Sequence, residues 1–388
     1  MRHAPGVILL IPSAREFDRG LRRGIVKYAQ AHGPWVFYEE PPAYLQSLGP
    51  RQRLRKMRAW KAQGIILLQN TLREVDELSI PTVVAIGTRK LGKGANQLLC
   101  ANEEIGRVGG ETFLALGLRN FAYCGLAGLE FSDNRALGFT QVIQQGGTSV
   151  HSYSSTTPHL AESWYAEQKQ LARWLSLLPK PIGVMACNDD RARMLAEACR
   201  LRGIRVPDEV AILGVDNDEQ VCNGANPPLS SIALATERGG YEAAALLDTL
   251  MQGRKPQSCT LFVNPTHVVA RQSTDTLAID EPTVVRALRF IRDNANKDIR
   301  VADLLAASGV SRRALQDRFR ECLGRTPIEE IHRCRVEHLA RLLVETNMTV
   351  SEIAAMSGFE LDAHVARFFS RHTGVTPLAY RTRNRALR

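Results

Sequence analysis

Acidic, amide and guanidinium side chains follow several short apolar segments within residues 1–278. The segment 184–187 leads into Asn-Asp-Asp, and the segment 210–215 leads into Asp-Asn-Asp. Because open α/β sheets bind ligands at the carboxyl ends of their strands, we expect these side chains to meet in one cleft. Such groups can hydrogen-bond the hydroxyls of a monosaccharide, while apolar walls contact its C–H faces. The candidate residues are Asp18, Arg135, Asn188, Asp189 and Asp216.

Each of these residues also has a purely structural interpretation. Asp18 and Asn188 stand where helices are predicted to begin, and Asp and Asn are ordinary helix N-caps. Arg135 is predicted to begin a helix directly after Ser-Asp-Asn. Their recurrence at successive strand ends is what favours a binding site.

A second set of candidate residues consists of arginines near the C-terminus. Arg312, Arg313 and Arg320 fall on the polar face of one predicted helix, and basic residues outnumber acidic ones in 281–388. Guanidinium groups pair with phosphates and with guanine edges. The arginines therefore indicate a nucleic-acid partner.

The region around these arginines contains an internal repeat. Ala-Ser-Gly-Val at 307–310 is matched by Met-Ser-Gly-Phe at 356–359. Farther on, the matching positions lie fifty residues apart, so one residue has been inserted in the second turn. The matched pairs are Leu315 and Val365, Phe319 and Phe369, Gly324 and Gly374, and Pro327 and Pro377.

Each copy of the repeat predicts a helix, a tight turn and a second helix. Gly309 stands where a left-handed residue would end the first helix, and Ser311 is a favourable N-cap for the next. Gly324 then ends that helix, and Thr326-Pro327 supplies the N-cap and first residue of another. The second copy follows the same plan.

Apolar spacing between the two copies predicts one long helix over about 327–345. At 1.5 Å per residue this helix would span roughly 27 Å. It could hold two recognition helices about one DNA turn apart, roughly 34 Å, on one face of the duplex. A helical bundle with capping glycines is the alternative, but the excess of arginine favours DNA binding.

Residues 1–278 alternate strand-like and helix-like segments. This alternation predicts parallel sheets that helices cover on both faces. No strand is followed by a Gly-x-Gly-x-x-Gly or P-loop motif, and no Ser-His-Asp set or metal-ligand cluster is visible in the sequence. A polar connection over 271–276 and Pro282 predicts a domain boundary near 279–282.

Composition limits the class of protein. The chain has 388 residues, a formal net charge of +10 and eight scattered cysteines, none at Cys-x-x-Cys spacing. This favours a polyanionic partner and a reducing compartment over a zinc site or disulfides. The apolar run at 7–12 is shorter than a secretory or membrane-spanning segment. We therefore expect a cytoplasmic protein without membrane association, bound metal or cofactor.

The repeat resembles the DNA-binding domain of the AraC/XylS regulators over essentially all of 283–383. The closest part is Phe369-x4-Gly374-x2-Pro377-x2-Tyr380-Arg381. In that family each recognition helix enters a major groove. By this resemblance Arg312, Arg313 and Gln316 would read bases from the first helix, and Arg320 and Arg371 would contact phosphates.

The second recognition helix departs from the pattern of that family. Asp362, Ala363 and Arg367 occupy the equivalent face. At the first two of these positions the family commonly has polar or basic side chains that contact bases. Val365 also replaces the usual phenylalanine. We therefore expect base reading chiefly from the first helix.

The N-terminal segment resembles the LacI/periplasmic-binding-protein sensor fold. The matching motifs are Arg135-x2-Gly138-Phe139, Asn188-Asp189 and Gly203-x3-Pro207-x2-Val210-x3-Gly214-x-Asp216. In that family the matching Arg, Asn and Asp bind the effector, which implies Arg135, Asn188 and Asp216 here, with Asp189 and Asp18 as further candidates. The fold class expected is a two-lobed α/β sensor followed by an all-α domain with two helix-turn-helix motifs.

A sensor of this type in front of an AraC-type reader resembles regulators of pentose catabolism. Phe17-Asp18-Arg19 and Asp189-x-Arg191-Ala192-Arg193 add to the resemblance. It implies a monosaccharide effector, D-xylose first. Asn102 stands where relatives often have an aspartate, so a non-sugar metabolite such as a nucleobase or amino acid remains an alternative.

The predicted protein is therefore a regulator of transcription controlled by effector binding. We expect a sensor at 1–278, a linker at 279–283 and a DNA-binding domain at 284–388, with helix-turn-helix motifs about 301–323 and 350–373. The partners would be operator DNA, a second copy in a homodimer and RNA polymerase, with activation expected from the resemblance and repression left open. A transport protein or a cysteine-based DNA-repair enzyme fits the sequence less well.

Overall fold

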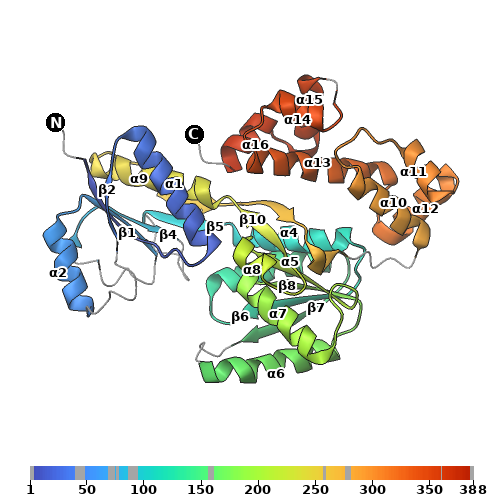
Figure 1. The fold of residues 1–388 in the computed structure, drawn as a ribbon, viewed down its shortest axis with the longest axis horizontal. Helices are drawn as coiled ribbons and strands as arrows, with labels where there is room; N and C mark the ends of the chain where they lie inside the picture. The colour runs from blue at the N-terminus through green and yellow to red at the C-terminus, as the bar shows by residue number, and fades with distance from the viewer. Residues whose placement is uncertain are drawn as a thin grey trace.

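The computed structural model describes residues 4–39, 49–68, 75, 78–85, 95–155, 161–256, 259–275, 281–359 and 361–384. Within these residues the chain forms two six-stranded sheets, each flanked by helices, and then a group of helices at the C-terminus. Figure 1 shows the two sheets as neighbouring lobes, with the C-terminal helices lying above the lobe on the right. The predicted fold class is confirmed.

The first lobe contains an all-parallel sheet. Helices α1 (Glu16–His32) and α9 (Thr236–Met251) cover one face, and α2 (Pro50–Trp60) covers the other. Alternate residues of the first strand enter separate cores, because successive strand side chains point to opposite faces. In sheet order the strands are β11 (Thr260–Val263), β5 (Gln97–Cys100), β4 (Thr82–Ala85), β3 (Gly64–Leu68), β1 (Gly6–Leu10) and β2 (Val36–Glu39).

The second lobe contains a sheet in which β12 alone runs antiparallel among the described strands. Helices α4 (Asn102–Ala115) and α5 (Glu130–Gln145) cover one face. Helices α6 (Ala161–Leu177) and α7 (Asp189–Arg202) cover the other, and the short α8 (Glu219–Asn223) follows β9. In sheet order the strands are β12 (Pro265–Val269), β10 (Ser230–Leu234), β9 (Val210–Val215), β8 (Ile182–Ala186), β6 (Phe121–Leu126) and β7 (Val150–Ser155).

The described chain crosses between the lobes at three places, which are β5 to α4, β10 to α9 and β11 to β12. Backbone hydrogen bonds tie these crossings together. Ala101 donates to the carbonyl of Val263, and Ala235 donates to the carbonyl of Asn264, both at 2.9 Å. The crossings therefore form one connected hinge.

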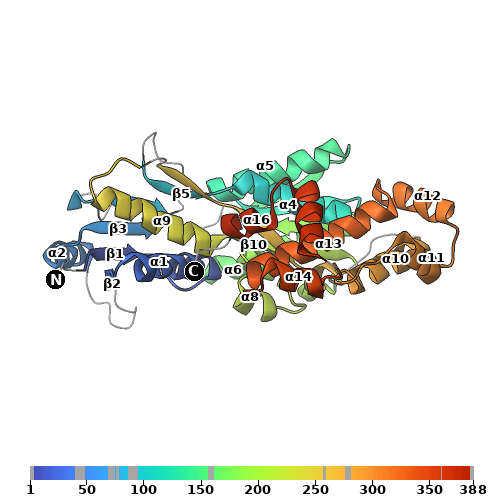
Figure 2. The same cartoon turned by 90° about the horizontal axis from the view of Figure 1, so that it is seen from above.

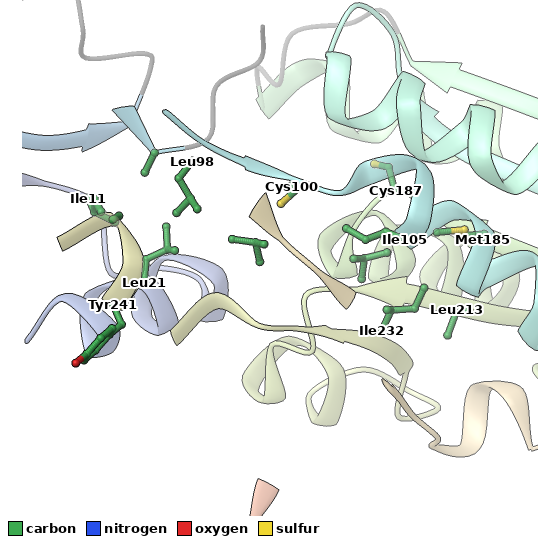
Figure 3. Close-up of a cluster of buried hydrophobic side chains, with 14 of the residues drawn as sticks. Ile11, Leu21, Leu98, Cys100, Ile105, Met185, Cys187, Leu213, Ile232 and Tyr241 are labelled. Atoms are coloured by element: carbon green, nitrogen blue, oxygen red, sulfur yellow. The ribbon is translucent and has the colours of Figure 1, made fainter. Parts of the chain in front are cut away.

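A single apolar cluster continues through this hinge from one lobe to the other. It contains Leu21 and Leu98 of the first lobe and Met185 and Leu213 of the second, all fully or almost fully buried. Figure 3 shows Cys100 and Ile105 between these two groups. The buried cysteines are thus part of the packing, in keeping with the scattered positions seen in the sequence.

The C-terminal helices form two units joined by one long helix. In Figure 1 the units lie at the two ends of α13, and Figure 2 shows the same helices from above. Each unit has its own small core, and α13 contributes to both. The helices are α10 (Pro282–Asp293), α11 (Val301–Ser308), α12 (Arg312–Leu323), α13 (Pro327–Glu345), α14 (Val350–Met356), α15 (Asp362–Thr373) and α16 (Pro377–Asn384).

The helix boundaries in this part follow the predicted capping residues. Gly309, Gly324 and Gly374 all adopt left-handed backbone angles directly after a helix. The Ser311 hydroxyl accepts a hydrogen bond from the amide of Ala314, and Thr326 forms a capping box with Glu329. These local predictions are confirmed because capping depends only on neighbouring residues.

Two sequence-based boundaries differ in the structure. Helix α5 begins at Glu130, so Arg135 lies inside the helix and does not begin it. Helix α10 begins at Pro282, within the predicted linker, because proline is favourable at the first helical position and Glu281 caps the helix. Residues 279 and 280 of that linker lie outside the described residues.

The two helix-turn-helix units are packed directly against each other. A Cβ on Gly358, in the second turn, would lie 2.7 Å from the amide nitrogen of Asp298, which belongs to the first unit. Arg335 of α13 donates to the Asp298 carboxylate at 2.7 Å and to the carbonyl of Ser357 at 3.0 Å. Its guanidinium also stacks over the Phe359 ring, 4.0 Å from the centroid. The units therefore have one fixed relative orientation.

Replacing Gly358 with alanine tests this close approach, and Gly309 offers a matched control. Both glycines have a φ near +70°, but a Cβ on Gly309 has no atom within 4 Å. Each alanine should cost about 1–2 kcal/mol for the left-handed backbone. Gly358→Ala should cost about 1–3 kcal/mol more, because the backbone at Asp298 must move. Urea unfolding followed by circular dichroism measures both losses, and equal losses would contradict the close approach.

Candidate functional site

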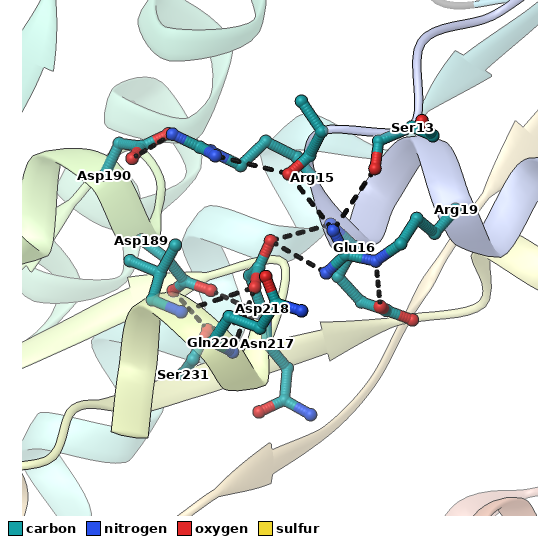
Figure 4. A network of polar contacts seen from close by, with 12 residues as sticks. Ser13, Arg15, Glu16, Arg19, Asp189, Asp190, Asn217, Asp218, Gln220 and Ser231 are labelled. Carbon is teal, nitrogen blue, oxygen red and sulfur yellow. Dashed lines mark hydrogen bonds and ion pairs between the residues drawn. The ribbon is translucent and has the colours of Figure 1, made fainter. Parts of the chain in front are cut away.

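The first lobe contacts the second through the beginning of α1. The Arg15 guanidinium bonds both carboxylate oxygens of Asp190, at 2.7 and 3.0 Å. The Asp218 carboxylate accepts from the Glu16 amide at 2.8 Å and from Arg19 at 3.2 Å. Figure 4 shows this network bridging the two lobes. A carboxylate at a helix N-terminus is favourable because it faces the positive end of the helix dipole.

Asp189 holds the backbone of Asp218, which belongs to this network, in place. It is almost fully buried, and its two carboxylate oxygens accept from the Asp218 amide at 2.7 Å and from the Ser231 hydroxyl at 2.6 Å. A Cβ at Gly214 would lie 2.2 Å from the Asp189 carboxylate, so glycine is needed there. Asp189 therefore shapes the loop after β9 with both of its oxygens.

Arg135 is buried where the two lobes meet. Its Nε donates to the side-chain oxygen of Asn102 at 3.0 Å, and another nitrogen donates to the carbonyl of Cys187. The guanidinium lies over the Phe131 ring, 5.2 Å from the centroid. Its remaining terminal nitrogen, Nη2, is 3.9 Å from an oxygen of Asp216. Burial of this charge is thus compensated by polar neighbours on several sides.

Asp216 has two features that are typical of binding sites. Its φ of +102° lies in a region that residues with side chains rarely adopt, and Asn217 follows with a φ of +51°. The Asp216 oxygen that faces Arg135 is buried and has no hydrogen-bond partner. Because an unpaired buried acceptor is costly, this oxygen is available to a ligand that donates a hydrogen bond.

The other two predicted residues lie at the same strand ends with different surroundings. Asn188 caps α7, since its side-chain oxygen accepts from the Arg191 amide at 2.9 Å, as its structural interpretation predicted. Asp18 lies in the first turn of α1 and is half-buried. Burial raises the pKa of Asp18 to about 6, although Arg15, Arg19 and Arg22 oppose the shift.

The site is rich in carboxylates whose proton affinity is increased. Burial raises the pKa of Asp189 and of Asp216, and the charge of Arg135 lowers that of Asp216 in part. The pKa of Asp218 is instead lowered, because backbone amides and Arg19 stabilise the ionised form against the cost of its burial. Acceptors and one buried guanidinium in this arrangement suit a ligand with several hydroxyl groups.

Sequence reasoning missed several residues of this site. Arg15 and Arg19 flank Asp18 in the sequence, and Asp218 and Ser231 had no assigned role. Their contacts join positions far apart in the chain, so no local pattern could have indicated them. The repeated Asp at the end of β9 was the only available signal for Asp218.

The predicted DNA-contacting residues of the first unit lie on α12. Arg312, Arg313 and Arg320 are exposed, and Gln316 is partly buried on the same helix. The Arg313 side chain is 94% exposed, with Asp317 3.9 Å away. Leu315 and Phe319 are fully buried on the opposite face and fix the orientation of the helix.

The predicted residues of the second unit lie on α15. Asp362, Ala363, Arg367 and Arg371 are all exposed. Asp362 is held in place, since its carboxylate accepts from the Ser351 hydroxyl at 3.1 Å and from the Ala363 amide at 2.8 Å. This helix therefore presents an anchored carboxylate where α12 presents exposed guanidinium groups.

Features of two other classes of protein are absent from the described residues. None of the helices there is long and apolar enough to cross a membrane. Over the same residues, no group of three or more His, Cys, Asp or Glu side chains is arranged to hold a metal ion.

Two family models match parts of the chain. A periplasmic binding protein-like domain matches residues 111–274, which include most of the second lobe. A helix-turn-helix domain matches residues 304–383, which include both repeat copies.

Proteins of similar sequence and structure match from two thirds to nearly all of the chain. The xylose operon regulatory protein of Escherichia coli K12 is 30% identical, and the match covers 97% of each chain. That of Haemophilus influenzae is 31% identical, covering 68% of this chain and 69% of the relative. The solved structure of a xylose-binding transcription activator is 27% identical, with a TM-score of 0.59 and 99% of each chain covered.

Replacing Asp189 with asparagine tests the buried carboxylate through the pH dependence of stability. Because the pKa of Asp189 is raised in the folded protein, its contribution to stability is complete below the unfolded pKa. That contribution is lost as the pH rises through the folded value. The free energy of unfolding of the wild type should fall between about pH 5 and pH 8. In Asp189→Asn this fall should be smaller by about 1–3 kcal/mol.

Thermal unfolding across this pH range measures the difference. The asparagine amide can still accept from the Asp218 amide and donate to the Ser231 hydroxyl, so the loop should keep its shape. Asp133→Asn is the control, because Asp133 is exposed on α5. If both variants follow the wild-type profile, Asp189 does not carry the pH dependence.

Proposed function

Because the chain belongs to the AraC-type helix-turn-helix regulators with a periplasmic-binding-protein-like sensor domain, the family of the xylose operon regulatory proteins, we propose that a pentose of the D-xylose class controls its activity. The observation that carries this proposal is the buried Arg135 at the hinge and the buried carboxylate oxygen of Asp216 that faces it. One Asp216 oxygen there lacks a hydrogen-bond partner, and the guanidinium nitrogen nearest to it is 3.9 Å away. A sugar hydroxyl can donate to that oxygen and accept from Arg135.

The effector would bind between the lobes, close to the polar network of α1. Arg135 and Asp216 would contact the sugar directly. The side-chain oxygen of Asn188 caps α7, so its side-chain nitrogen would donate a hydrogen bond to the sugar. Asp18 would contribute from the first lobe. Asp189 would act by holding the loop, because both of its oxygens already accept hydrogen bonds. The proposed effector site therefore comprises Asp18, Arg135, Asn188, Asp189 and Asp216, of which Asp189 acts through the loop and not by direct contact.

Sugar binding would control the protein through the relative position of its lobes. Arg15–Asp190 and Arg19–Asp218 join the lobes at the edge of the proposed site. A ligand shifts such an equilibrium only by its difference in affinity for the two arrangements. A pentose that contacts both lobes would favour the state in which these ion pairs are made.

The DNA-binding residues proposed are those on the exposed faces of α12 and α15. Phosphate contacts from Arg320 and Arg371 would set the register, while Arg312, Arg313 and Gln316 would read bases. Arg367 would be the chief contact from the second unit, beside Asp362 and Ala363. We further propose that the protein is a cytoplasmic activator that works as a homodimer and contacts RNA polymerase.

The domain division proposed is a sensor at 1–278, a linker at 279–283 and a DNA-binding domain at 284–388. The observed start of α10 at Pro282 makes the linker shorter by two residues. Two compact helical cores and a separate α/β part support this division.

Asn102 favours a second candidate for the effector. Its side-chain oxygen accepts from Arg135, so a neutral amide faces the buried guanidinium at a position where a carboxylate would add negative charge. The site is consequently less acidic and could hold a ligand with an anionic group, such as an amino acid. Repression by such a metabolite is the corresponding alternative to activation.

Calorimetric titration with D-xylose, beside L-arabinose, D-ribose and D-glucose, tests the proposed effector. Xylose should bind in the micromolar range, and Asp216→Ala should weaken it by about tenfold or more, since a buried hydrogen bond to a charged group is lost. Glu219→Ala, at an exposed residue of the neighbouring α8, is the control. Heat from none of the sugars, or unchanged affinity in Asp216→Ala, would reject this site.

Footprinting and anisotropy titrations with the identified operator test the proposed DNA contacts. Arg312→Ala should weaken operator binding by about 1–3 kcal/mol and relax sequence preference at one position, because a base contact is lost. Arg320→Ala should weaken binding to all sequences alike and lower the salt dependence by about one ion. Identical behaviour of the two variants would contradict the division between base and phosphate contacts.

A further inference from the structure

The C-terminal half is attached to the sensor at both ends of α13. Near the beginning of α13, Arg325 donates to the carbonyl of Ala115 at 3.0 Å. At its last residue, the Glu345 carboxylate accepts from the ring nitrogen Nε2 of His267 at 2.8 Å, and nearby the Tyr380 hydroxyl donates to the carbonyl of Thr266 at 2.6 Å. We call these contacts the first and the second attachment.

The first attachment joins α13 to the helix that begins beside the proposed effector site. Ala115 is the last residue of α4, so its carbonyl has no partner within the helix and carries partial negative charge. The Arg325 guanidinium is itself held by Glu330, at 2.6 Å, and Glu330 is fully buried. The contact between α4 and α13 is therefore made by a side chain with a fixed position.

Helix α4 moves as one body with α5, which carries Arg135. A Cβ on Gly106 would lie 2.1 Å from the carbonyl oxygen of Arg135, and a Cβ on Gly138 would lie 1.9 Å from that of Glu103. The two backbones touch at these glycines, so neither helix can slide without the other. At its other end, Asn102 of α4 bonds Arg135 directly. Displacement at Arg135 is thus carried along α4 to Ala115.

The second attachment joins α13 to the strand that follows the hinge, which is the edge strand of the sheet in the second lobe. His267 and Thr266 lie on β12, which begins directly after the crossing at Asn264. Between the two attachments lies a cavity of about 680 Å³, bounded by α4, the segment 268–275, the end of α10 and α13. The halves therefore touch near the ends of α13 and have space between them.

We propose that Arg325 and the His267–Glu345 pair are positioning residues that turn effector binding into a movement of α13. Both attachments belong to the second lobe, because β12 pairs with β10 and α4 covers the same sheet, so α13 follows that lobe when the angle between the lobes changes. Helix α13 contributes Ile331 to the core of the first unit and Leu339 to that of the second. Both helix-turn-helix units then move with it. This inference rests on the proposed sugar effector.

Hydrogen exchange with and without saturating D-xylose tests the coupling in the full-length protein. In the wild type, xylose should change the exchange rate of amides in α13 by about fivefold or more. Arg325→Met and Glu345→Ala should each reduce this remote response to less than about twofold while xylose affinity, measured by calorimetry, stays within about twofold. A merely structural role would lower stability but leave the response intact.

Arg333→Met is the matched control. Arg333 pairs with the same buried Glu330, at 2.7 Å, but it bonds only to residues of its own helix, which are Glu330, Cys334 and Glu337 among the described residues. This variant should lose about as much thermal stability as Arg325→Met and keep the xylose response. The proposal would be overturned if Arg325→Met or Glu345→Ala responded to xylose like the wild type. It would also be overturned if xylose bound the wild type without any change in the exchange of α13.

A separate measurement distinguishes this proposal from the choice of effector. If xylose does not bind the wild type, the proposed effector is wrong, and differential scanning calorimetry then tests the attachments alone. The wild type should unfold in one transition, whereas the double variant Arg325→Met with Glu345→Ala should unfold in two. One transition in both proteins would overturn the attachments as coupling contacts.

Discussion

The burial of one guanidinium at the junction of the two lobes constrains much of the sensor. A buried charge is tolerated only when polar groups surround it, and Arg135 obtains them from α4, from the end of β8 and from the loop after β9. These segments must therefore meet at one point. The strained backbone at Asp216 and the glycine beside Asp189 are consequences, because they bring the loop after β9 close enough.

Close backbone packing converts this local constraint into a rigid unit. The glycines of α4 and α5 allow the two helices to touch, and the apolar cluster continues through the hinge into the first lobe. Besides this cluster, the two lobes are joined by the three crossings and by the ion pairs at the beginning of α1. The proposed ligand site lies beside these junctions, between two lobes that are each packed as a unit.

The sequence predicted features that depend on neighbouring residues and missed those that depend on distant ones. Gly309 and Thr326 were identified because helix ends have local chemistry. Arg15 and Arg325 were missed because their partners lie far along the chain, on other elements. Asp189 was predicted as a ligand contact, yet its two oxygens accept from the protein, which only the arrangement of β10 and the loop after β9 reveals.

The packing between the two helix-turn-helix units limits how a signal can act on DNA binding. Arg335 joins α13 to both units, and the absence of a side chain at Gly358 lets the second turn rest on the backbone of the first unit. Their spacing on DNA is therefore a property of the C-terminal half alone. A sensor attached to this half at the ends of α13 can change where the pair of units stands relative to the sensor, but not how far apart the units are. Control by an effector must accordingly act on the C-terminal half as a whole, by orienting it for DNA or for a second copy of the chain.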